Sequence, residues 1–282
     1  MTTRKFPSLD EKSIAETKDA LHAYARVLGA WIKTCRTKRK HWWHASLRPS
    51  LTGLTTGVIH ADADFEMELD MRSSQLHIRT PTGEAHAEPL RGQPAFQLAD
   101  VIADFLAASG INEDFAAKIN PGIERTKEFD GYTEETANRI ARVFGDVAAT
   151  MARFRAEIRE EASPIQVWPH HFDLSMLWLP GEKVPDQNPE NEESADKQMN
   201  FGFVLGDDSI HEPYLYVTAY PLPDGLANDR LPSGTVWQAQ PFQGAVLLYK
   251  TLSNMSQPTD YLLDLWRVLL ASGREHMLDQ VA

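Results

Sequence analysis

An aspartate follows two adjacent histidines in the segment IQVWPHHFDLSMLWLPG, residues 165–181. If this segment is one extended strand, alternate side chains point to the same side, so His171 and Asp173 share a face and His170 lies on the other. An imidazole and a carboxylate at this spacing can bind a divalent metal together, or the carboxylate can orient the imidazole for proton transfer. His171 and Asp173 are therefore the first candidates for chemistry.

A metal site needs more ligands than this pair provides. The others would have to come from the segment DDSIHEPYLYV, through His211 or Glu212, or from KHWWH, through His41 and His44. The alternative is that these polar groups only satisfy hydrogen bonds at strand ends and in loops. The sequence favours no metal, and if one binds, the histidine–aspartate pair supplies the expected ligands.

Two carboxylates, Asp173 and Glu212, are the candidate catalytic residues. Glu212 precedes Pro213, which keeps the local backbone extended. If both carboxylates lie in one cleft beside aromatic walls, partial desolvation raises their pKa and suits them to acid/base work. The alternative is that each carboxylate caps a turn independently. The residues expected to line such a cleft and bind a ligand are Trp42, Trp43, Trp168 and His41.

Other catalytic motifs are missing from the sequence. Gly202 and Gly206 bracket an apolar run, but no Lys or Ser/Thr follows at the spacing of a phosphate-binding loop, and Asp207 would repel phosphate. There is no Gly-x-Ser-x-Gly nucleophile elbow. The single cysteine, Cys35, excludes an internal disulfide and a multi-thiolate zinc site, and it favours a reducing compartment.

The chain carries 40 acidic and 28 basic side chains, a net charge of −12, which repels nucleic acid and anionic membranes. One segment, KTCRTKRKHWWH, combines basic residues with two tryptophans, a pairing that single-stranded nucleic-acid binders use. The alternative, which we favour, is a cationic helix C-terminus stabilised by the helix dipole. Apolar runs fall far below the roughly 18 residues of a membrane span. We therefore expect a soluble, cytoplasmic protein with no nucleic-acid or membrane partner.

Helices and strands alternate in groups along the chain. Apolar residues at three- and four-residue spacing predict an amphipathic helix from Ile14 to Cys35, and further helices over 94–110, 133–161 and 258–270. Segments rich in β-branched and aromatic residues, several with period-two alternation, predict two blocks of strands between these helices. Grouped strands are typical of an α+β fold, here two mainly antiparallel strand-rich blocks covered by at least four helices.

The chain is expected to form either one compact unit, 1–282, or two related halves, 1–130 and 131–282. In the strand FEMELD, alternation sends the apolar side chains inward and the acidic side chains to solvent. The segment EKVPDQNPENEESADKQ, residues 182–198, has almost no apolar content and should be an acidic, flexible loop.

Three blocks carry a resemblance to a known family. They are His41-Trp42-Trp43 with Gly53-Leu54-Thr55-Thr56, Ser163-Pro164 with Phe172-Asp173-Leu174, and Gly202-Phe203 with Glu212-Pro213 and Tyr216. In these blocks the chain resembles a family of uncharacterised bacterial proteins, domain of unknown function number 5996. The resemblance spans most of the chain and implies no activity. Many members have small residues in place of His170-His171 but share Phe-Asp-Leu, which implies that Asp173, Glu212 and the two tryptophans matter more than the histidines.

The sequence leaves the function, the cofactors and the oligomeric state unknown. The hypothesis we favour is a cytosolic protein that binds a small molecule, as an enzyme that uses carboxylate acid/base chemistry in an aromatic-lined cleft. The alternative is a non-catalytic binding or protein-interaction module on the same aromatic surface. Whether the protein is an enzyme is left open.

Overall fold

The computed structural model describes residues 5–61, 63–111, 123, 125–191, 193–240 and 242–278. The chain forms two compact units. Unit 1 contains Met1–Glu11, Asp146–Ile165 and Asp173–Ala282, and unit 2 contains Lys12–Gly145 and Gln166–Phe172. Neither unit is a continuous stretch of chain, and helix α4 (Glu134–Glu157) contributes to both. The expectation of one unit, or of halves divided at residue 130, stays a prediction.

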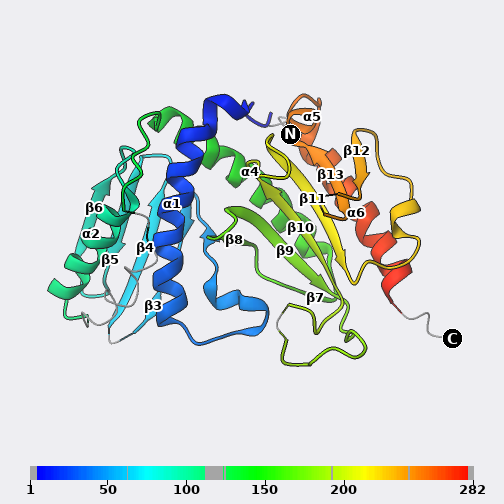
Figure 1. Cartoon of the computed structure of the whole chain (residues 1–282), viewed down its shortest axis with the longest axis horizontal. Helices are drawn as coiled ribbons and strands as arrows, with labels where there is room; N and C mark the ends of the chain where they lie inside the picture. The colour runs from blue at the N-terminus through cyan, green and yellow to red at the C-terminus, as the bar shows by residue number, and fades with distance from the viewer. Residues whose placement is uncertain are drawn as a thin grey trace. The chain divides into compact units, whose positions relative to one another are not determined.

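Unit 2 places a long helix against an antiparallel sheet (Figure 1). The sheet has the order β1-β2-β4-β5-β6, with β3 beside β4. Its strands are β1 (Arg48–Pro49), β2 (Gly53–Thr55), β3 (Ile59–His60), β4 (Asp64–Asp70), β5 (Gln75–Arg79) and β6 (Ala85–Pro89). Helix α1 (Glu11–Cys35) buries an apolar stripe, from which Trp31 meets Phe65 of β4 edge-on at 6.1 Å between ring centroids. Helix α2 (Ala95–Ala108) lies beside β6.

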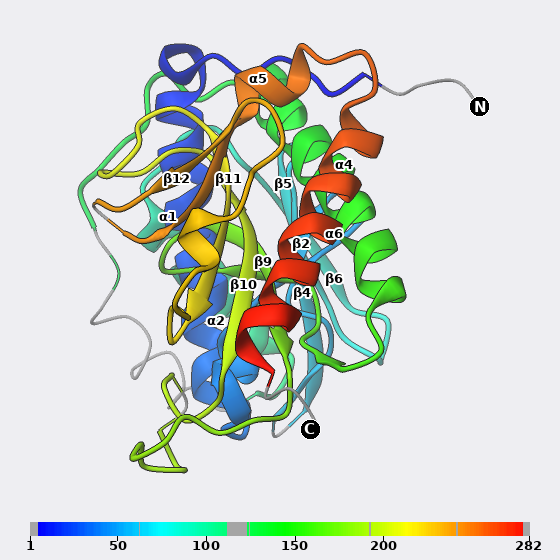
Figure 2. The same cartoon turned by 90° about the vertical axis from the view of Figure 1, so that its right-hand side faces the viewer.

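Unit 1 is built on a second antiparallel sheet, with the order β12-β13-β11-β10-β9-β7. Its strands are β7 (Glu161–Ala162), β9 (Asp173–Leu179), β10 (Gln198–Val204), β11 (Tyr214–Tyr220), β12 (Thr235–Gln238) and β13 (Gly244–Leu248). Helix α6 (Pro258–Met277) runs beside α4 (Figure 2). Phe154 of α4 packs on Phe201 of β10 and on Trp266 of α6, with ring centroids 5.0 and 5.5 Å apart. The two helices therefore cover one face of this sheet.

Polar contacts fasten the ends of unit 1. The Arg274 guanidinium of α6 donates two hydrogen bonds of 2.7 Å to the Glu160 carboxylate. Helix α5 (Tyr249–Ser253) follows β13 directly, and Tyr249 Oη donates to the Pro7 carbonyl at 2.7 Å. Phe6 stacks on the same tyrosine, with ring centroids 6.3 Å apart. An early and a late part of the chain are thus held together within one unit.

The predicted fold class is confirmed, because the strands form two antiparallel sheets and helices pack on them. The helix expected from Ile14 to Cys35 begins at Glu11 and ends at Cys35. The helix expected over 258–270 continues to Met277, because the apolar stripe of α6 extends to that buried residue. Among the described residues, no helix has the length and apolar content to cross a membrane.

The segment 182–198 leaves the unit 1 sheet between β9 and β10, and most of its described residues are exposed. Its two ends are joined: Lys197 Nζ lies 2.5 Å from a Glu182 oxygen, and Lys183 Nζ lies 2.6 Å from an Asp196 oxygen. Position 192 lies outside the described residues. Two ion pairs therefore join the ends of the loop, and the flexibility of the loop stays a prediction.

Candidate functional site

Residues 169–172 form a turn before β9 and do not continue a strand. The Trp168 carbonyl accepts hydrogen bonds from the backbone amides of His171 at 3.3 Å and Phe172 at 2.7 Å. Phe172 takes a left-handed φ of 56°. Pro169 cannot donate to a strand ladder because it has no N–H.

The expectation that the strand block from Ile165 to Leu179 is one continuous strand is therefore wrong at residues 169–172. The alternation that put His171 and Asp173 on one face applies only within a continuous strand. β8 (Gln166–Trp168) ends before the histidines, and Asp173 begins β9. Strand alternation therefore does not pair His171 with Asp173, either as metal ligands or as a proton-transfer couple.

Asp173 is a buried carboxylate in the unit 1 sheet, with 7% of its surface exposed. Tyr216 Oη of β11 donates a hydrogen bond to Asp173 Oδ2 at 2.5 Å. The Ser175 hydroxyl also hydrogen bonds to the phenol. Ser175, Gly202 and Tyr216 lie directly opposite one another on three neighbouring strands, so their side chains point to the same face. We call this arrangement the Asp173–Tyr216 pair.

Gly202 provides the space that the pair requires. The ring of Tyr216 lies over this glycine: a Cβ placed there would stand 2.5 Å from Tyr216 Cε1 and closer still to Cζ and Oη. A non-glycine residue would push the ring away from Asp173. From the sequence, Gly202 was interpreted as a strand residue that does not form a phosphate loop and as part of a block shared with a family. The close approach of the Tyr216 ring to Gly202 depends on the strand register, so it could not be predicted from the sequence.

The Asp173–Tyr216 pair keeps the phenol protonated. Burial, together with the charge of Asp173 and the hydrogen bond to it, raises the pKa of Tyr216 well above its usual value. Burial also raises the pKa of Tyr214, whose hydroxyl donates to Asp207 Oδ2 at 2.7 Å. Tyr216 is therefore a permanent hydrogen-bond donor at neutral pH, and its partner is held as the acceptor.

A small apolar cluster adjoins the pair on the sheet face away from α4 and α6. Val204 pairs with Asp173 on one side and with Tyr214 on the other, so these three side chains share that face. The cluster consists of Val204, Tyr214 and Val246, with Ile210, Tyr216, Phe242 and Leu248 packed against it. The carboxylate is thus bordered by aromatic and aliphatic groups.

Glu212, the second candidate carboxylate, lies at the same end of the sheet. It is half-buried in the connection between β10 and β11, two residues before Tyr214. The chain turns tightly there, because a Cβ on Gly206 would collide with the backbone of the segment that contains Glu212. The strand register brings the carboxylates of Asp173 and Glu212 to the same end of the sheet. That the two carboxylates line one cleft stays a prediction.

The aromatic candidates belong to unit 2. His41, Trp42 and Trp43 lie in the 3-10 helix η1 (Lys40–Ala45), where His41 and Trp42 have φ values of 48° and 58°. Left-handed backbone at two consecutive bulky residues costs roughly 1–2 kcal/mol each, and such strain is often concentrated at functional sites. Lys33 and Lys38 place their ammonium groups 5.9 and 5.4 Å from the centre of the Trp42 ring. This tryptophan presents its face to cations.

Trp168 and the two histidines cluster at the turn before β9. The rings of His170 and His171 are 4.2 Å apart between centroids, and Trp168 meets His170 edge-on at 5.9 Å. His22 of α1 stacks on Phe172 at 5.5 Å. Burial, reinforced by electrostatic repulsion between the two imidazoles, lowers the pKa of His170 to about 4. Among the described residues, no group of three or more His, Cys, Asp or Glu side chains is arranged to hold a metal.

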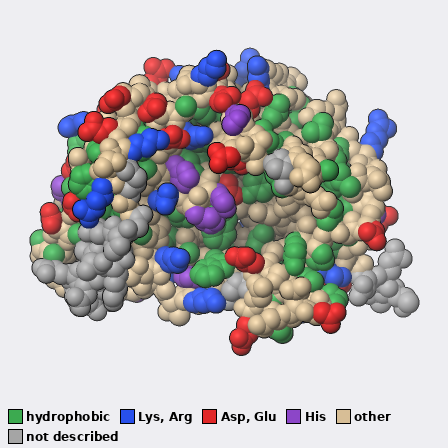
Figure 3. All heavy atoms as spheres, in the orientation of Figure 1, with side chains coloured by type: hydrophobic (Ala, Val, Ile, Leu, Met, Phe, Trp, Pro, Cys, Tyr) green, Lys and Arg blue, Asp and Glu red, His purple; other side chains and the backbone are tan. Residues whose placement is uncertain are grey.

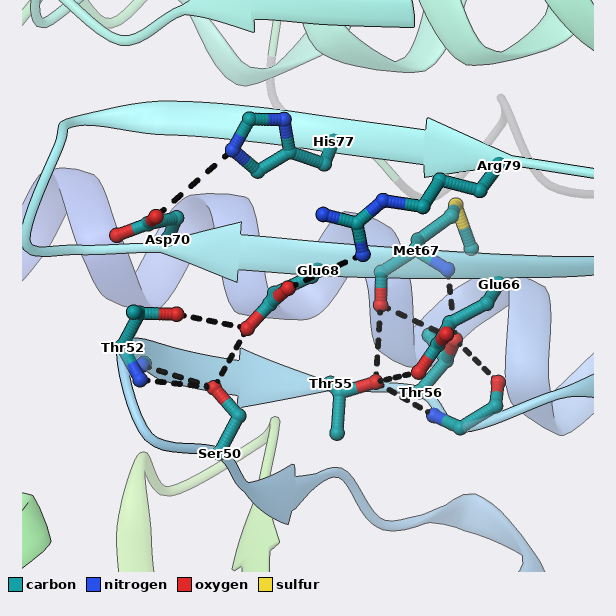
Figure 4. Close-up of polar contacts among 12 residues, drawn as sticks. Ser50, Thr52, Thr55, Thr56, Glu66, Met67, Glu68, Asp70, His77 and Arg79 are labelled. Atoms are coloured by element: carbon teal, nitrogen blue, oxygen red, sulfur yellow. Dashed lines mark hydrogen bonds and ion pairs between the residues drawn. The ribbon is translucent and has the colours of Figure 1, made fainter. Parts of the chain in front are cut away.

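The acidic strand β4 alternates as predicted, with Phe65, Met67 and Leu69 buried. Its acidic face carries a hydrogen-bond network (Figure 4). The Glu68 carboxylate accepts bonds from Ser50 Oγ at 2.8 Å, from Thr52 Oγ1 at 2.7 Å and from Arg79 at 3.3 Å. Burial raises the pKa of Glu68, but these bonds outweigh it and leave that pKa lowered. The network holds the turn that precedes β2 against strand β4, so its role is structural.

One further cluster of polar side chains, in unit 1, was not predicted from the sequence. The Asp229 carboxylate accepts a hydrogen bond from Ser272 Oγ and lies 3.1 Å from His276 Nε2. These are the residue types of a hydrolase triad, but the carboxylate stands between the other two, so the histidine does not take the serine proton. The cluster ties α6 to the loop at Asp229. No local spacing in the sequence signals it, because 43 residues separate the serine from the aspartate.

Comparison with known proteins identifies a protein family for this chain. The chain matches a family of unknown function (DUF5996) over residues 6–275. No curated protein and no solved structure matches it. Asp173 comes from one of the three sequence blocks and Gly202 and Tyr216 from another, and the three residues lie on three adjacent strands.

Proposed function

Because the chain belongs to this family of unknown function, DUF5996, we propose its function from the geometry alone: it binds a small molecule through the Asp173–Tyr216 pair. The observation that carries the proposal is the 2.5 Å hydrogen bond from Tyr216 Oη to the buried Asp173 carboxylate. A buried carboxylate destabilises a fold unless hydrogen bonds compensate its lost hydration. Apolar residues at these positions would avoid that cost, so a recognition role explains why the polar pair is present.

The surroundings of the pair indicate the class of ligand. An ionised carboxylate only accepts hydrogen bonds, so the complementary group on the ligand is a donor, a hydroxyl or an amine. The apolar cluster around Val204, Tyr214 and Val246 suits an aliphatic or aromatic body. We propose a small ligand with an apolar body and a donor group that reaches Asp173.

The geometry supports a binding anchor better than an acid/base catalyst. A general acid or base must gain and lose a proton near the working pH. The pKa of Tyr216 is raised well above its usual value by burial and by the charge of Asp173, so its phenol keeps its proton near neutral pH. Non-catalytic binding, the alternative from the sequence, is therefore the function we propose, and proton transfer by Asp173 and Glu212 stays a prediction.

We also infer the compartment and the class of partner from the composition. The single cysteine favours a cytosolic location. The net charge of −12 favours a small-molecule partner over nucleic acid.

A thermal-shift screen of hydroxyl- and amine-bearing metabolites tests the proposal. We expect at least one compound to raise the Tm of the wild type, with the shift lost in Asp173→Asn and reduced in Tyr216→Phe. Tyr249→Phe is the matched control, since this other buried tyrosine donates, among the described residues, only to the Pro7 carbonyl and should leave binding unchanged. Hits that stabilise Asp173→Asn as strongly as the wild type would contradict the proposal.

A further inference from the structure

Unit 2 contains a region of concentrated positive charge in an acidic protein. Residues 20–61 include no Asp or Glu but seven basic residues: Arg26, Lys33, Arg36, Lys38, Arg39, Lys40 and Arg48. In Figure 3, Lys, Arg and His side chains gather on the face that shows α1. Most such charges are ordinary solvated groups, and two arginines differ from them.

Arg48 is half-buried on β1 and bonds only to neutral oxygens. Its guanidinium donates to Ser46 Oγ at 2.6 Å and, at 3.4 Å, to the carbonyls of Leu47 and Trp43. No ion pair joins Arg48 to a carboxylate among the described residues. Burial lowers the pKa of Arg48 to about 10, and the positive charge of Arg36 acts in the same direction.

Arg36 approaches the same place from the end of α1. Its guanidinium donates to the Thr56 carbonyl and, at 3.4 Å, to that of Val58. Thr55, the residue before Thr56, is the direct cross-strand partner of Arg48. Arg36 also bonds to no carboxylate among the described residues. The charge of Arg36 acts on Arg48, and neither guanidinium bonds to a carboxylate among the described residues.

Neutral donors without acceptors lie beside them. Leu47 and Val167 exchange two backbone hydrogen bonds of 3.0 Å. This antiparallel bridge places the next residues, Arg48 and Gln166, opposite each other and facing the same side. The Gln166 side chain is 1% exposed, and its Nε2 has no hydrogen-bond partner among the described residues. The buried indole Nε1 of Trp43, in the 3-10 helix η1, has none within the same part of the chain.

The cluster thus offers two positive charges without an ion pair among the described residues, and Gln166 adds an unused N–H donor opposite Arg48. On the same sheet face the Glu68 carboxylate, opposite Thr55, is already bound by Ser50, Thr52 and Arg79. Half-buried like charges repel each other, and a buried donor without an acceptor costs about 1–3 kcal/mol. An oxyanion would relieve both costs at once. Arginine forks match the geometry of phosphate and carboxylate oxygens.

We propose that Arg36, Arg48 and Gln166 form an anion site in unit 2 that takes the phosphate group of a small phosphate monoester. Such a group carries a charge of about −1.5 to −2 at neutral pH and balances two guanidinium groups, whereas a carboxylate or a phosphodiester would balance one. Gln166, fully buried, makes the site too enclosed for a polymer backbone. The site is independent of the Asp173–Tyr216 pair.

The test is thermal unfolding in Tris-chloride buffer, titrated with inorganic phosphate at constant ionic strength. We expect a saturable rise in the Tm of the wild type. Arg48→Met should raise the phosphate concentration at half-saturation about tenfold or more, because it removes a charge-assisted donor. Without phosphate, the same variant should be at least as stable as the wild type, because an uncompensated charge is removed.

Arg39→Met is the matched control, since this exposed arginine of the same basic segment should leave the phosphate response unchanged. If Arg48→Met does not fold, Arg36→Met replaces it, and the same rise in the phosphate concentration at half-saturation is expected. An equal phosphate response in wild type and both site variants would overturn the proposal. Binding of single-stranded DNA that is lost in Arg48→Met would also overturn it, because the ligand would then be a nucleic acid.

Discussion

Gly202→Ala should destabilise the protein because its new methyl group occupies the position of the Tyr216 ring. The ring would have to move by roughly 1 Å or more, and overpacking of this kind costs about 1–3 kcal/mol. The movement also breaks the 2.5 Å hydrogen bond to Asp173, a bond to a charged group that contributes about 1.5–3 kcal/mol. We expect a total loss of about 3–5 kcal/mol, a large part of the ~5–15 kcal/mol of an ordinary domain.

A double-mutant cycle measured by urea unfolding separates this explanation from a general effect of alanine in a strand. Tyr216→Ala removes the ring, so Gly202→Ala should cost little in that background, a coupling of about 2–3 kcal/mol. Gly145→Ala is the control: nothing lies within 4 Å of its new methyl group, and in the interior of α4 it should stabilise by about 0.5–1 kcal/mol. If Gly202→Ala destabilises equally with and without the Tyr216 ring, the reasoning is refuted.

Three other outcomes are expected. Two hydrogen bonds from Arg274 hold the pKa of Glu160 at about 2, below its unfolded value of 4.5. The contribution of Glu160 to the free energy of unfolding is therefore complete above pH 4.5 and is lost as the pH falls toward 2. Measured by urea unfolding, Glu160→Gln should cost about 1 kcal/mol at pH 7, after allowance for solvent screening, and nothing at pH 2. Limited proteolysis should cut first within 182–198, and first cuts within 133–161 would contradict the prediction. Gel-shift assays should detect no useful affinity for single-stranded DNA, whereas salt-sensitive micromolar binding lost in Lys38→Ala/Arg39→Ala would show the opposite.

The elements that were predictable from the sequence are those whose pattern is local. The apolar stripe of α1 and the alternation of β4 each follow from the period of one segment, and both are confirmed. The prediction of a strand through residues 169–172 was wrong because the aromatic residues and histidines there suggest an extended backbone. Pro169 and the left-handed Phe172 instead turn the chain. A single proline within a β-rich segment was the available signal.

The candidate site was only partly predictable for a different reason. Asp173 stands out because it is an acidic residue in an apolar segment. Its donor, Tyr216, comes from 43 residues further along, and only the register of three strands brings the two together. The arginine pair was hidden as well, because Arg36 looked like one of several cations at a helix end. Burial and the lack of a carboxylate partner are properties of the folded chain, so neither can be found from spacing.

The contact between Pro7 and Tyr249 sets the order in which unit 1 can be completed during synthesis. Phe6 and Pro7 leave the ribosome about 240 residues before their aromatic partner, a delay of roughly 10–50 s at ordinary rates of translation. In that interval the strands of β9, β10 and β11 emerge while β13, which pairs with β11, is still missing. A nascent chain stalled before Gly244 therefore exposes the unpaired edge of β11 while Phe6 and Pro7 still lack Tyr249, and unpaired strand edges promote aggregation.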